Sequence, residues 1–497
     1  MKKEPGLKSK IFKGVSWMAA SKIVNRGFIL LTTLILARLL SPRDFGLVAS
    51  AIVVFNFLTL FSNSGLGVAI AQSKEDLDED DLSTIFWPNL LLGVILFGLS
   101  FAASSLVASF FGDAKVRPIL IGLSVSLVTD SFSTVHVGYL TRIMDFRTLS
   151  IREIIASLGY GVSAVIGALL GWGAWALVFG YLVKSVLNAA TLWFSVSWRP
   201  SLVFNWRTFK RIYAFGLKLV GNGFIEFFRR NTDRGLIGRI LGTSTLGVYS
   251  IAYSLIMIPR DQITPLVTRV LLPAYSRIQD DNARLEKAYL RAVQYVSLVT
   301  VPVALGLAAT APELIEVLFG SKWLGAVAPL QYLSIAGALL SINPVLGYVL
   351  VAKGRPGIFV AWNFVRTLFT MGFIYLGLIW GGLTGVAAGF SLAVLLDTPI
   401  TQYISIRPVG GSMRALWKAI LPVFGATLLM VAAVFGLRAG LLPLGVSKLA
   451  VLILSVLAGA VIYFLALRAV RFKALSELTS LGIKLARRYT ESRKVGV

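Results

Sequence analysis

The chain has 497 residues, of which 56% are hydrophobic and only 14% are charged, whereas soluble globular proteins carry about a quarter charged residues. Water is therefore not its main solvent, and the composition indicates an integral membrane protein. The absence of cysteine excludes disulfide frameworks, thiolate metal sites and cysteine nucleophiles. The net charge of +25 is compatible with nucleic-acid binding, so the positions of the basic residues must decide that question.

Fourteen apolar windows are long enough to cross the membrane, because about 20 helical residues span roughly 30 Å of hydrocarbon. The windows are 14–37, 45–71, 85–111, 119–140, 154–170, 174–196, 212–240, 246–272, 292–311, 327–351, 358–380, 383–405, 416–437 and 449–467. They are continuously apolar, unlike the alternating segments of about ten residues in membrane β-barrels. The sequence therefore predicts an all-α integral membrane protein with 14 transmembrane helices. We expect no removable signal peptide, because the first window lacks a cleavage site.

The basic residues predict the orientation of these helices. Most of the 48 Lys and Arg residues fall in gaps on the same side of the membrane as the N-terminus. Because the cytoplasmic side retains positive charge, both termini are predicted to be cytoplasmic. Topology thus accounts for most of the positive charge, and we expect no nucleic-acid partner.

The residues after the last window form a basic tail, 471–497. Leucines 475, 478, 481 and 485 share one helical face, and Lys484, Arg487 and Arg488 are available to anionic headgroups. This pattern favours a cytoplasmic amphipathic helix that contacts membrane lipids. The alternative is a partly disordered basic tail.

An internal repeat links residues 38–48 with residues 239–249. RLLS followed by FGLV in the first copy matches RILG followed by LGVY in the second. Six windows precede the second copy, so both copies enter the membrane in the same orientation, as in transporters with parallel repeats. This predicts two six-helix lobes, 1–200 and 201–410, around a central cavity, plus two C-terminal helices within 411–470. The alternative is chance similarity between apolar segments.

Ionisable residues inside the windows are the candidate functional residues, because one charge at the bilayer centre costs at least about 2.5 kcal/mol. They gather in two windows that the repeat pairs. Window 14–37 carries Lys22, Asn25 and Arg26, and window 212–240 carries Lys218, Glu226, Arg229, Arg230, Asp233 and Arg234. The four-residue spacings predict ion pairs between Glu226 and Arg230 and between Arg229 and Asp233.

Cations still outnumber carboxylates in this set, which predicts a cationic cavity suited to phosphate or acidic sugar groups. The residues predicted to bind substrate there are Lys22, Arg26, Arg229, Arg230 and Arg234. Asn25, Glu226 and Asp233 are predicted to support them. The alternative is that these charges only form internal salt bridges or lie near a membrane face.

Lys184, Arg366 and Asp397 are interpreted as lone charges with either a packing or a substrate role. Asp397 is also a candidate carrier of a coupling ion. The single histidine, His136, points away from Asp130 and is interpreted as a satisfied polar residue. Phosphate-loop, zinc-protease and serine-hydrolase motifs are absent, so we expect no enzyme activity, no cofactor and no metal.

Several motifs resemble the polysaccharide transporter branch of the multidrug/oligosaccharidyl-lipid/polysaccharide exporter superfamily, the Wzx-type flippases. These motifs are ARLLSPRDFG at 37–46, GLG at 65–67 with Ala69 and Gln72, LGVYSIAY at 246–253 and LPAYSR at 272–277. The likeness is closest to colanic-acid and teichuronic-acid exporters. It implies two lobes arranged in a V and alternating access in a bacterial inner membrane, with an undecaprenyl-pyrophosphate-linked oligosaccharide as cargo. It also implies a cationic cavity lined by the first and seventh helices, with H⁺ or Na⁺ as the coupling ion.

Three other functions stay open on the sequence alone. One is a MATE-like drug or metabolite exporter of the same superfamily. Exporters of cationic drugs favour acidic cavities, so the surplus of arginine in this sequence argues against that function. A membrane polysaccharide polymerase or ligase presents a large outer loop, and the outer gaps here are short. A scaffold for glycosyltransferase or polymerase machinery, which is a candidate partner, needs no buried arginine.

Overall fold

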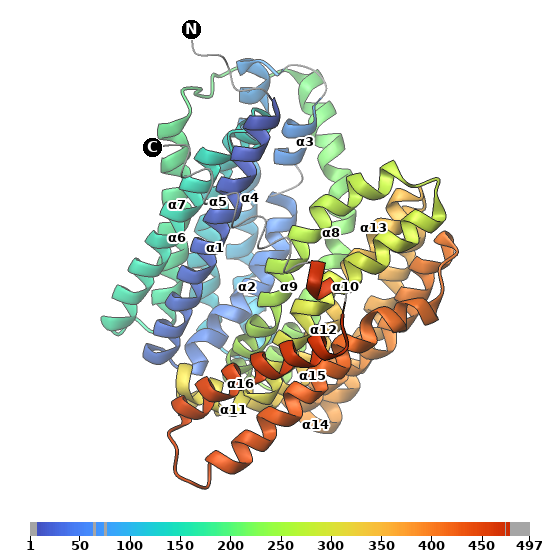
Figure 1. Ribbon diagram of the computed structural model, residues 1–497. Helices are drawn as coiled ribbons and strands as arrows, with labels where there is room; N and C mark the ends of the chain where they lie inside the picture. The colour runs from blue at the N-terminus through green and yellow to red at the C-terminus, as the bar shows by residue number, and fades with distance from the viewer. Residues whose placement is uncertain (1–6, 63–65, 74–76, 473, 478–497) are drawn as a thin grey trace, which may run out of the picture. The chain divides into compact units, whose positions relative to one another are not determined.

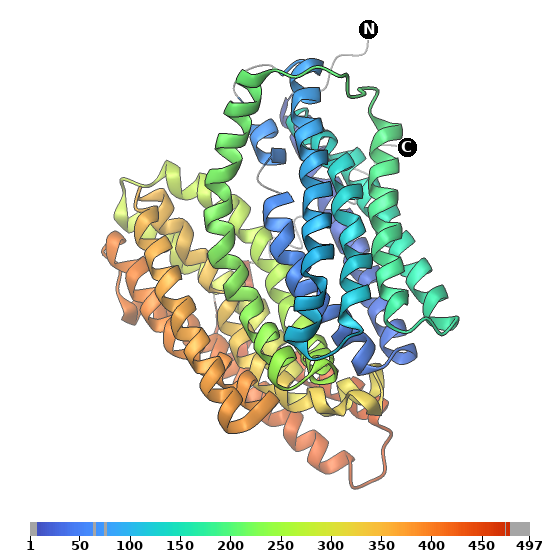
Figure 2. The same ribbon diagram turned by 180° about the vertical axis from the view of Figure 1, so that it is seen from behind.

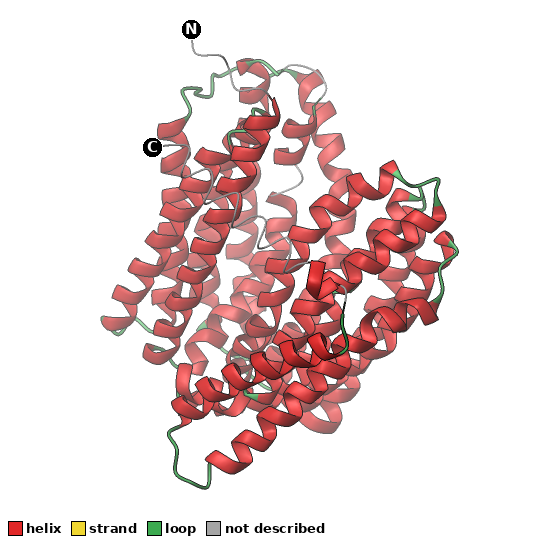
Figure 3. Cartoon of the chain, viewed as in Figure 1, coloured by secondary structure: helices red, strands yellow, loops and turns green. Residues whose placement is uncertain are grey.

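The computed structural model describes residues 7–62, 66–73, 77–472 and 474–477, and within them all regular structure is helical (Figure 3). Each apolar window overlaps a helix, because only a helix satisfies the backbone N–H and C=O groups of a single segment in lipid. The all-α fold of this multi-pass membrane protein is therefore confirmed. Among the described residues, ten helical segments are long and apolar enough to cross a membrane. The number of fourteen crossings stays a prediction.

The chain divides into two compact units, Met1–Ser250 and Ile251–Val497. Figure 1 colours unit 1 from blue to green and unit 2 from green to red. The limits of the predicted six-helix lobes differ from these units and stay a prediction. Most of the predicted basic tail, residues 473 and 478–497, lies outside the described residues.

Unit 1 is built around α5. Its helices are α1 (Leu7–Leu39), α2 (Pro42–Ser62), α3 (Leu66–Gln72), α4 (Glu79–Phe111), α5 (Val116–Arg142), α6 (Phe146–Leu169), α7 (Ala174–Ser195), α8 (Trp206–Ile240) and the start of α9 (Thr243–Arg277). Helix α5 packs against α2, α3, α4 and α7, and Figure 2 shows α4 running alongside it. Helix α6 packs between α1 and α7. Buried Leu120, Leu123 and Leu177 belong to the apolar core that holds these helices together.

The two segments that the sequence repeat pairs lie against each other within unit 1. A Cβ atom added to Gly46 of α2 would lie 1.7 Å from the carbonyl oxygen of Thr243. A Cβ atom added to Gly247 of α9 would lie 1.9 Å from the carbonyl oxygen of Pro42. The backbones of α2 and α9 therefore touch where both residues are glycine, a close approach that small residues allow between membrane helices.

Asp113, in the turn between α4 and α5, strengthens this contact. Its Oδ2 atom accepts hydrogen bonds from Arg43 Nη2 at 3.0 Å and from Thr243 Oγ1 at 3.2 Å, and its Oδ1 atom accepts from the Lys115 amide at 3.1 Å. Burial opposes ionisation of Asp113, but the hydrogen bonds from Lys115, Arg43 and Thr243 together lower its pKa below the ordinary 3.8. Arg239 also donates to two backbone carbonyls at the end of α4, at 3.0 and 2.7 Å.

Unit 2 contains the rest of α9 and a second helical core. Its elements are α10 (Asn282–Ala309), α11 (Ala311–Leu318), η1 (Ser321–Ala326), α12 (Val327–Leu340), α13 (Asn343–Ala352), α14 (Pro356–Ile406), η2 (Arg407–Val409), α15 (Met413–Leu441) and α16 (Lys448–Ala469). Helix α14 is two helices, because Gly381 and Gly382 have non-helical backbone angles and Gly382 has a φ of 54°. Arg438 of α15 binds the buried Glu313 of α11 at 2.9 Å. Helix α10 packs against α12 and α15.

We predict that Gly46→Ala destabilises the protein although alanine favours helix by about 1 kcal/mol over glycine. Its methyl group would overlap the Thr243 carbonyl, and overpacking costs typically about 1–3 kcal/mol. Gly98→Ala in α4 is the matched control, because no atom lies within 4 Å of its added Cβ. Thermal unfolding of the purified protein in detergent should show a lower midpoint for Gly46→Ala only. Equal midpoints for the two variants would contradict the close contact.

The hydrogen bonds of Asp113 predict a pH-dependent contribution to stability. Because its folded pKa is lowered, that contribution is fully present above the unfolded value near 3.8 and is lost as the pH falls through the folded pKa. The difference in unfolding temperature between the wild type and Asp113→Asn should be constant from pH 7 to 5 and shrink below about pH 4. The exposed Asp280 gives the control variant, Asp280→Asn. A difference that grows in acid would contradict this account.

Candidate functional site

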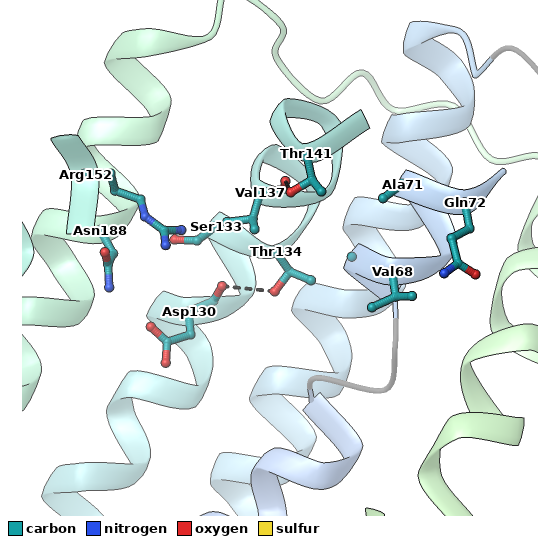
Figure 4. Close-up of a pocket in the computed structure, with 11 residues that line it drawn as sticks. Val68, Ala71, Gln72, Asp130, Ser133, Thr134, Val137, Thr141, Arg152 and Asn188 are labelled. Carbon is teal, nitrogen blue, oxygen red and sulfur yellow. Dashed lines mark hydrogen bonds between the residues drawn. The ribbon is translucent and has the colours of Figure 1, made fainter. Parts of the chain in front are cut away.

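One face of α5 carries a row of polar side chains. Asp130, Ser133, Thr134 and Thr141 recur at helical spacing, so they point to the same side of the helix. They line a cavity of about 600 Å³, here called the polar cavity (Figure 4). The other residues that line it are Gly67, Val68, Ala71 and Gln72 from α3, Val137 from α5, Arg152 from α6 and Asn188 from α7. Residues from four helices of unit 1 thus converge on one space.

A second cavity of about 250 Å³ adjoins the polar cavity. The two share Val137, Thr141 and Arg152. The second cavity is also lined by Ser21 and Lys22 from α1 and by Phe146, Leu149, Ser150 and Glu153 from α6. The structure therefore places the predicted site residue Lys22 at a cavity, and it places Arg152 at the boundary between two cavities.

Several groups at this boundary have no partner within the part of the chain that the structure describes. The Ser133 hydroxyl is 7% exposed and forms no hydrogen bond, and the buried Nε atom of Arg152 forms none either. Figure 4 shows Arg152 reaching from α6 towards Ser133. Thr134 Oγ1, by contrast, donates to the backbone carbonyl of Asp130 at 3.2 Å. Unpaired polar groups are expensive inside a membrane protein, so these groups are available to a ligand.

The two carboxylates of the site are held by neutral donors. Ser185 Oγ donates to Asp130 Oδ1 at 2.5 Å, and Asn25 Nδ2 donates to Glu153 Oε1 at 3.0 Å. Lys184 and Arg152 are the cations that interact electrostatically with Asp130. Neither carboxylate forms a salt bridge with Arg152 among the described residues. The guanidinium therefore keeps its hydrogen-bonding capacity.

Asn25 and Arg26 were expected beside the cationic residues of window 212–240, but α1 packs mainly on α6. Asn25 is buried and bound to Glu153, and the Nε atom of Arg26 has no hydrogen-bond partner in the described part of the chain. Helix α8 packs instead on α2, α3 and α4. The assignment of Arg26 to substrate binding stays a prediction.

Three charged residues of α8, Glu226, Arg229 and Arg230, pair with one another. Glu226 accepts from Arg229 Nε at 2.7 Å and also forms an ion pair with Arg230, so the predicted pair Glu226–Arg230 is confirmed. The predicted pair Arg229–Asp233 is wrong, because Arg229 binds Glu226 one turn earlier. Asp233 is buried and accepts from the Tyr249 hydroxyl of α9 at 2.6 Å. A tertiary partner has thus replaced the expected helical neighbour.

None of Arg229, Arg230 and Arg234 lines either cavity. The backbone N–H of Arg234 donates to Asp233 Oδ1 at 2.8 Å. Their predicted contact with substrate remains a prediction, and the side chain of Lys218 lies outside the described residues.

Arg366 and Asp397 were expected to be lone charges, and the structure corrects this. Both lie on α14, on either side of its glycine break, and Arg366 Nη1 is 3.7 Å from Asp397 Oδ2. Asp397 Oδ1 accepts from Trp362 Nε1 at 3.1 Å and from Thr401 Oγ1 at 2.9 Å. The break folds the two halves of α14 back on each other, which brings these distant residues together. Ion coupling through Asp397 stays a prediction.

Sequence reasoning missed Arg152 and Asn188. The fifth window starts at residue 154, which left Arg152 in a cytoplasmic gap, but α6 begins at Phe146 behind the capping residue Asp145. The side chain of Asp145 accepts from the Thr148 amide at 3.1 Å, and this N-cap signal was present in the sequence. The polar spacing along 130–141 was a second signal, because it marks a helix face that does not contact lipid.

A family model described as polysaccharide biosynthesis protein matches residues 35–328. Among curated relatives, the lipopolysaccharide biosynthesis protein WzxC of Escherichia coli (strain K12) is 28% identical, over 82% of this chain and 83% of that protein. The teichuronic acid biosynthesis protein TuaB of Bacillus subtilis (strain 168) is 27% identical, over 94% of this chain and 97% of that protein.

Solved structures share the fold. The lipid II flippase MurJ, in an inward closed conformation, matches with a TM-score of 0.76 at 15% identity, over 93% of this chain and 99% of that one. An inward-facing multidrug resistance MATE family transporter of the MOP superfamily matches with a TM-score of 0.63 at 17% identity, over 82% of this chain and 99% of that one.

The family model spans more than half of the chain, and it agrees with the resemblance that the sequence motifs indicate. The chain belongs to the polysaccharide biosynthesis protein family.

Proposed function

We propose that this protein is a flippase that moves an undecaprenyl-pyrophosphate-linked oligosaccharide across the bacterial inner membrane by alternating access. Its relatives are named for the biosynthesis of lipopolysaccharide and of teichuronic acid, and the structural neighbour MurJ is named a lipid II flippase. The predicted cytoplasmic termini and the many apolar helices are consistent with this location. Transport, not catalysis, is the proposed activity.

The observation that carries the proposal is the guanidinium of Arg152 between two cavities. Arginine binds phosphate oxygens with two parallel N–H donors, which lysine does not match. The side chain of Arg152 forms no salt bridge within the described chain, and Lys22 adds a second cation at the adjoining cavity. A diphosphate would supply hydrogen-bond acceptors for the guanidinium of Arg152 and attract both cations.

The position of the second cavity also fits a lipid-linked cargo. Thr141 and Phe146 line it and flank the turn between α5 and α6, which the charge distribution predicts to be cytoplasmic. A headgroup synthesised on the cytoplasmic side would therefore reach Lys22 and Arg152 without first crossing the bilayer.

A MATE-like exporter of cationic drugs is the second candidate, and the charges of the site argue against it. Such a cavity needs surplus negative charge, whereas Asp130 and Glu153 here are matched by Arg152 and Lys22. A polymerase or ligase has no specific support in the described residues.

We predict that Arg152→Met slows transport of the lipid-linked oligosaccharide at least about tenfold, because charge-assisted hydrogen bonds contribute roughly 1.5–3 kcal/mol. The measurement uses proteoliposomes with a fluorescent undecaprenyl-diphosphate oligosaccharide whose inner-leaflet fraction is read by chemical quenching. Arg117→Met, at an exposed position of α5, is the control. Unchanged transport by a folded Arg152→Met protein would remove this arginine from the mechanism.

A second prediction concerns coupling. Either Arg366→Gln or Asp397→Asn alone should destabilise the protein by about 3–5 kcal/mol, because each removes one partner of a buried ion pair. The double variant removes both charges and should recover most of that stability.

If Asp397 carries the coupling ion, transport by the double variant no longer accelerates when a proton or sodium gradient is applied. Gradient-dependent acceleration at the wild-type level in the double variant would exclude Asp397 as the carrier.

A further inference from the structure

We propose that the polar cavity is the subsite for the sugar next to the diphosphate, and that Asp130 makes it select a neutral sugar over a uronic acid. The inference rests on the proposed function and names part of its cargo. The chemistry of the lining differs between the two cavities that share Arg152.

The polar cavity offers both hydrogen-bond donors and hydrogen-bond acceptors. Asp130 Oδ2 has no partner in the described chain and can only accept, whereas the unpaired Ser133 hydroxyl and the Asn188 amide can do both. A diphosphate has only acceptors, so it cannot satisfy Asp130. Neighbouring hydroxyls of a sugar donate and accept, and they match this mixed lining.

The arrangement orders the two parts of the ligand. Arg152 lines both cavities and Lys22 lines only the second, so both cations reach the diphosphate side, whereas Asp130, Ser133 and Asn188 lie on the sugar side. Ligand sites for small molecules measure about 300–1,000 Å³, and the polar cavity, at about 600 Å³, is in that range. The second cavity, at about 250 Å³, is smaller and suits a headgroup fragment.

The polar cavity also leaves a way out for the rest of the oligosaccharide. Val68 and Gln72 of α3 are exposed side chains that line its edge, and Val68 is 46% exposed. The first sugar can therefore be held inside while later sugars extend past α3. Selection then acts on the first sugar.

Asp130 is fixed in place, which makes it a selective group. Ser185 holds its Oδ1 atom, and the Ser185 hydroxyl shares a further hydrogen bond with the hydroxyl of Thr129 on α5. A uronic acid would bring a second carboxylate next to this one, and like charges in close contact are strongly unfavourable. A neutral hexose or N-acetylhexosamine meets no such repulsion and donates hydroxyls to Oδ2.

The experiment measures binding to the purified full-length protein in lipid nanodiscs with three probes: farnesyl diphosphate, farnesyl-diphosphate-glucose and farnesyl-diphosphate-glucuronic acid. The wild type should bind the glucose probe at least about tenfold more tightly than the glucuronic acid probe. Asp130→Asn should reduce this ratio to about threefold or less. Asn188→Ala should weaken the binding of the glucose probe about tenfold and leave the affinity for farnesyl diphosphate unchanged. The control is Asp280→Asn, an exposed carboxylate of unit 2.

Equal affinity of the wild type for both sugar probes would overturn the inference. A uniform loss for all three probes in folded Asn188→Ala would also overturn it, because the residue would then be structural. If all three probes bind with the same affinity and that binding is lost in Arg152→Met, this inference is wrong and the proposed function stands. If the wild type binds none of the three probes, both this inference and the proposed function are contradicted. Asn188→Ala keeps the test valid if Asp130→Asn does not fold.

Discussion

The guanidinium of Arg152 must find an anion, because its helix α6 is apolar enough to cross a membrane and the described residues offer it no salt bridge. The carboxylates nearby, Asp130 and Glu153, are each held by a neutral donor, Ser185 and Asn25. That arrangement leaves the guanidinium at the boundary of two cavities without a direct salt bridge among the described residues. An anionic headgroup would supply the hydrogen-bond acceptors that the guanidinium lacks, and the proposed roles of the other site residues follow from where that headgroup lies.

The packing of unit 1 keeps this boundary in position. Helix α5 provides the polar face. It also packs against α3 and α7, which contribute other residues to the lining of the polar cavity. The glycine contact between α2 and α9 and the hydrogen bonds of Asp113 join the start of α9 to the α4–α5 turn. The backbones of α2 and α9 touch at these glycines, so no side chain between them can adjust its conformation. Small shifts of either helix should therefore displace the helices around the site.

The sequence predicted the helices well, because the length of an apolar segment in a membrane leaves little structural choice. It also predicted the ion pair Glu226–Arg230, which depends only on helical spacing. The sequence did not predict the partners of charged residues where tertiary contacts determine them. Asp233 binds Tyr249 of another helix, and the break at Gly381 and Gly382 brings Arg366 to Asp397. Arg152 was missed for a simpler reason, because hydropathy does not detect the polar first turns of α6.

The central claim is that Arg152, rather than the arginines of α8, holds the diphosphate of the cargo. A cryo-electron microscopy structure of the full-length protein with an undecaprenyl-diphosphate oligosaccharide bound tests it most directly. The account predicts phosphate oxygens about 2.7–2.9 Å from the guanidinium of Arg152, with the first sugar beside Asp130. A diphosphate bound at Arg229 and Arg230, with the cavities on α5 and α6 empty, would contradict it.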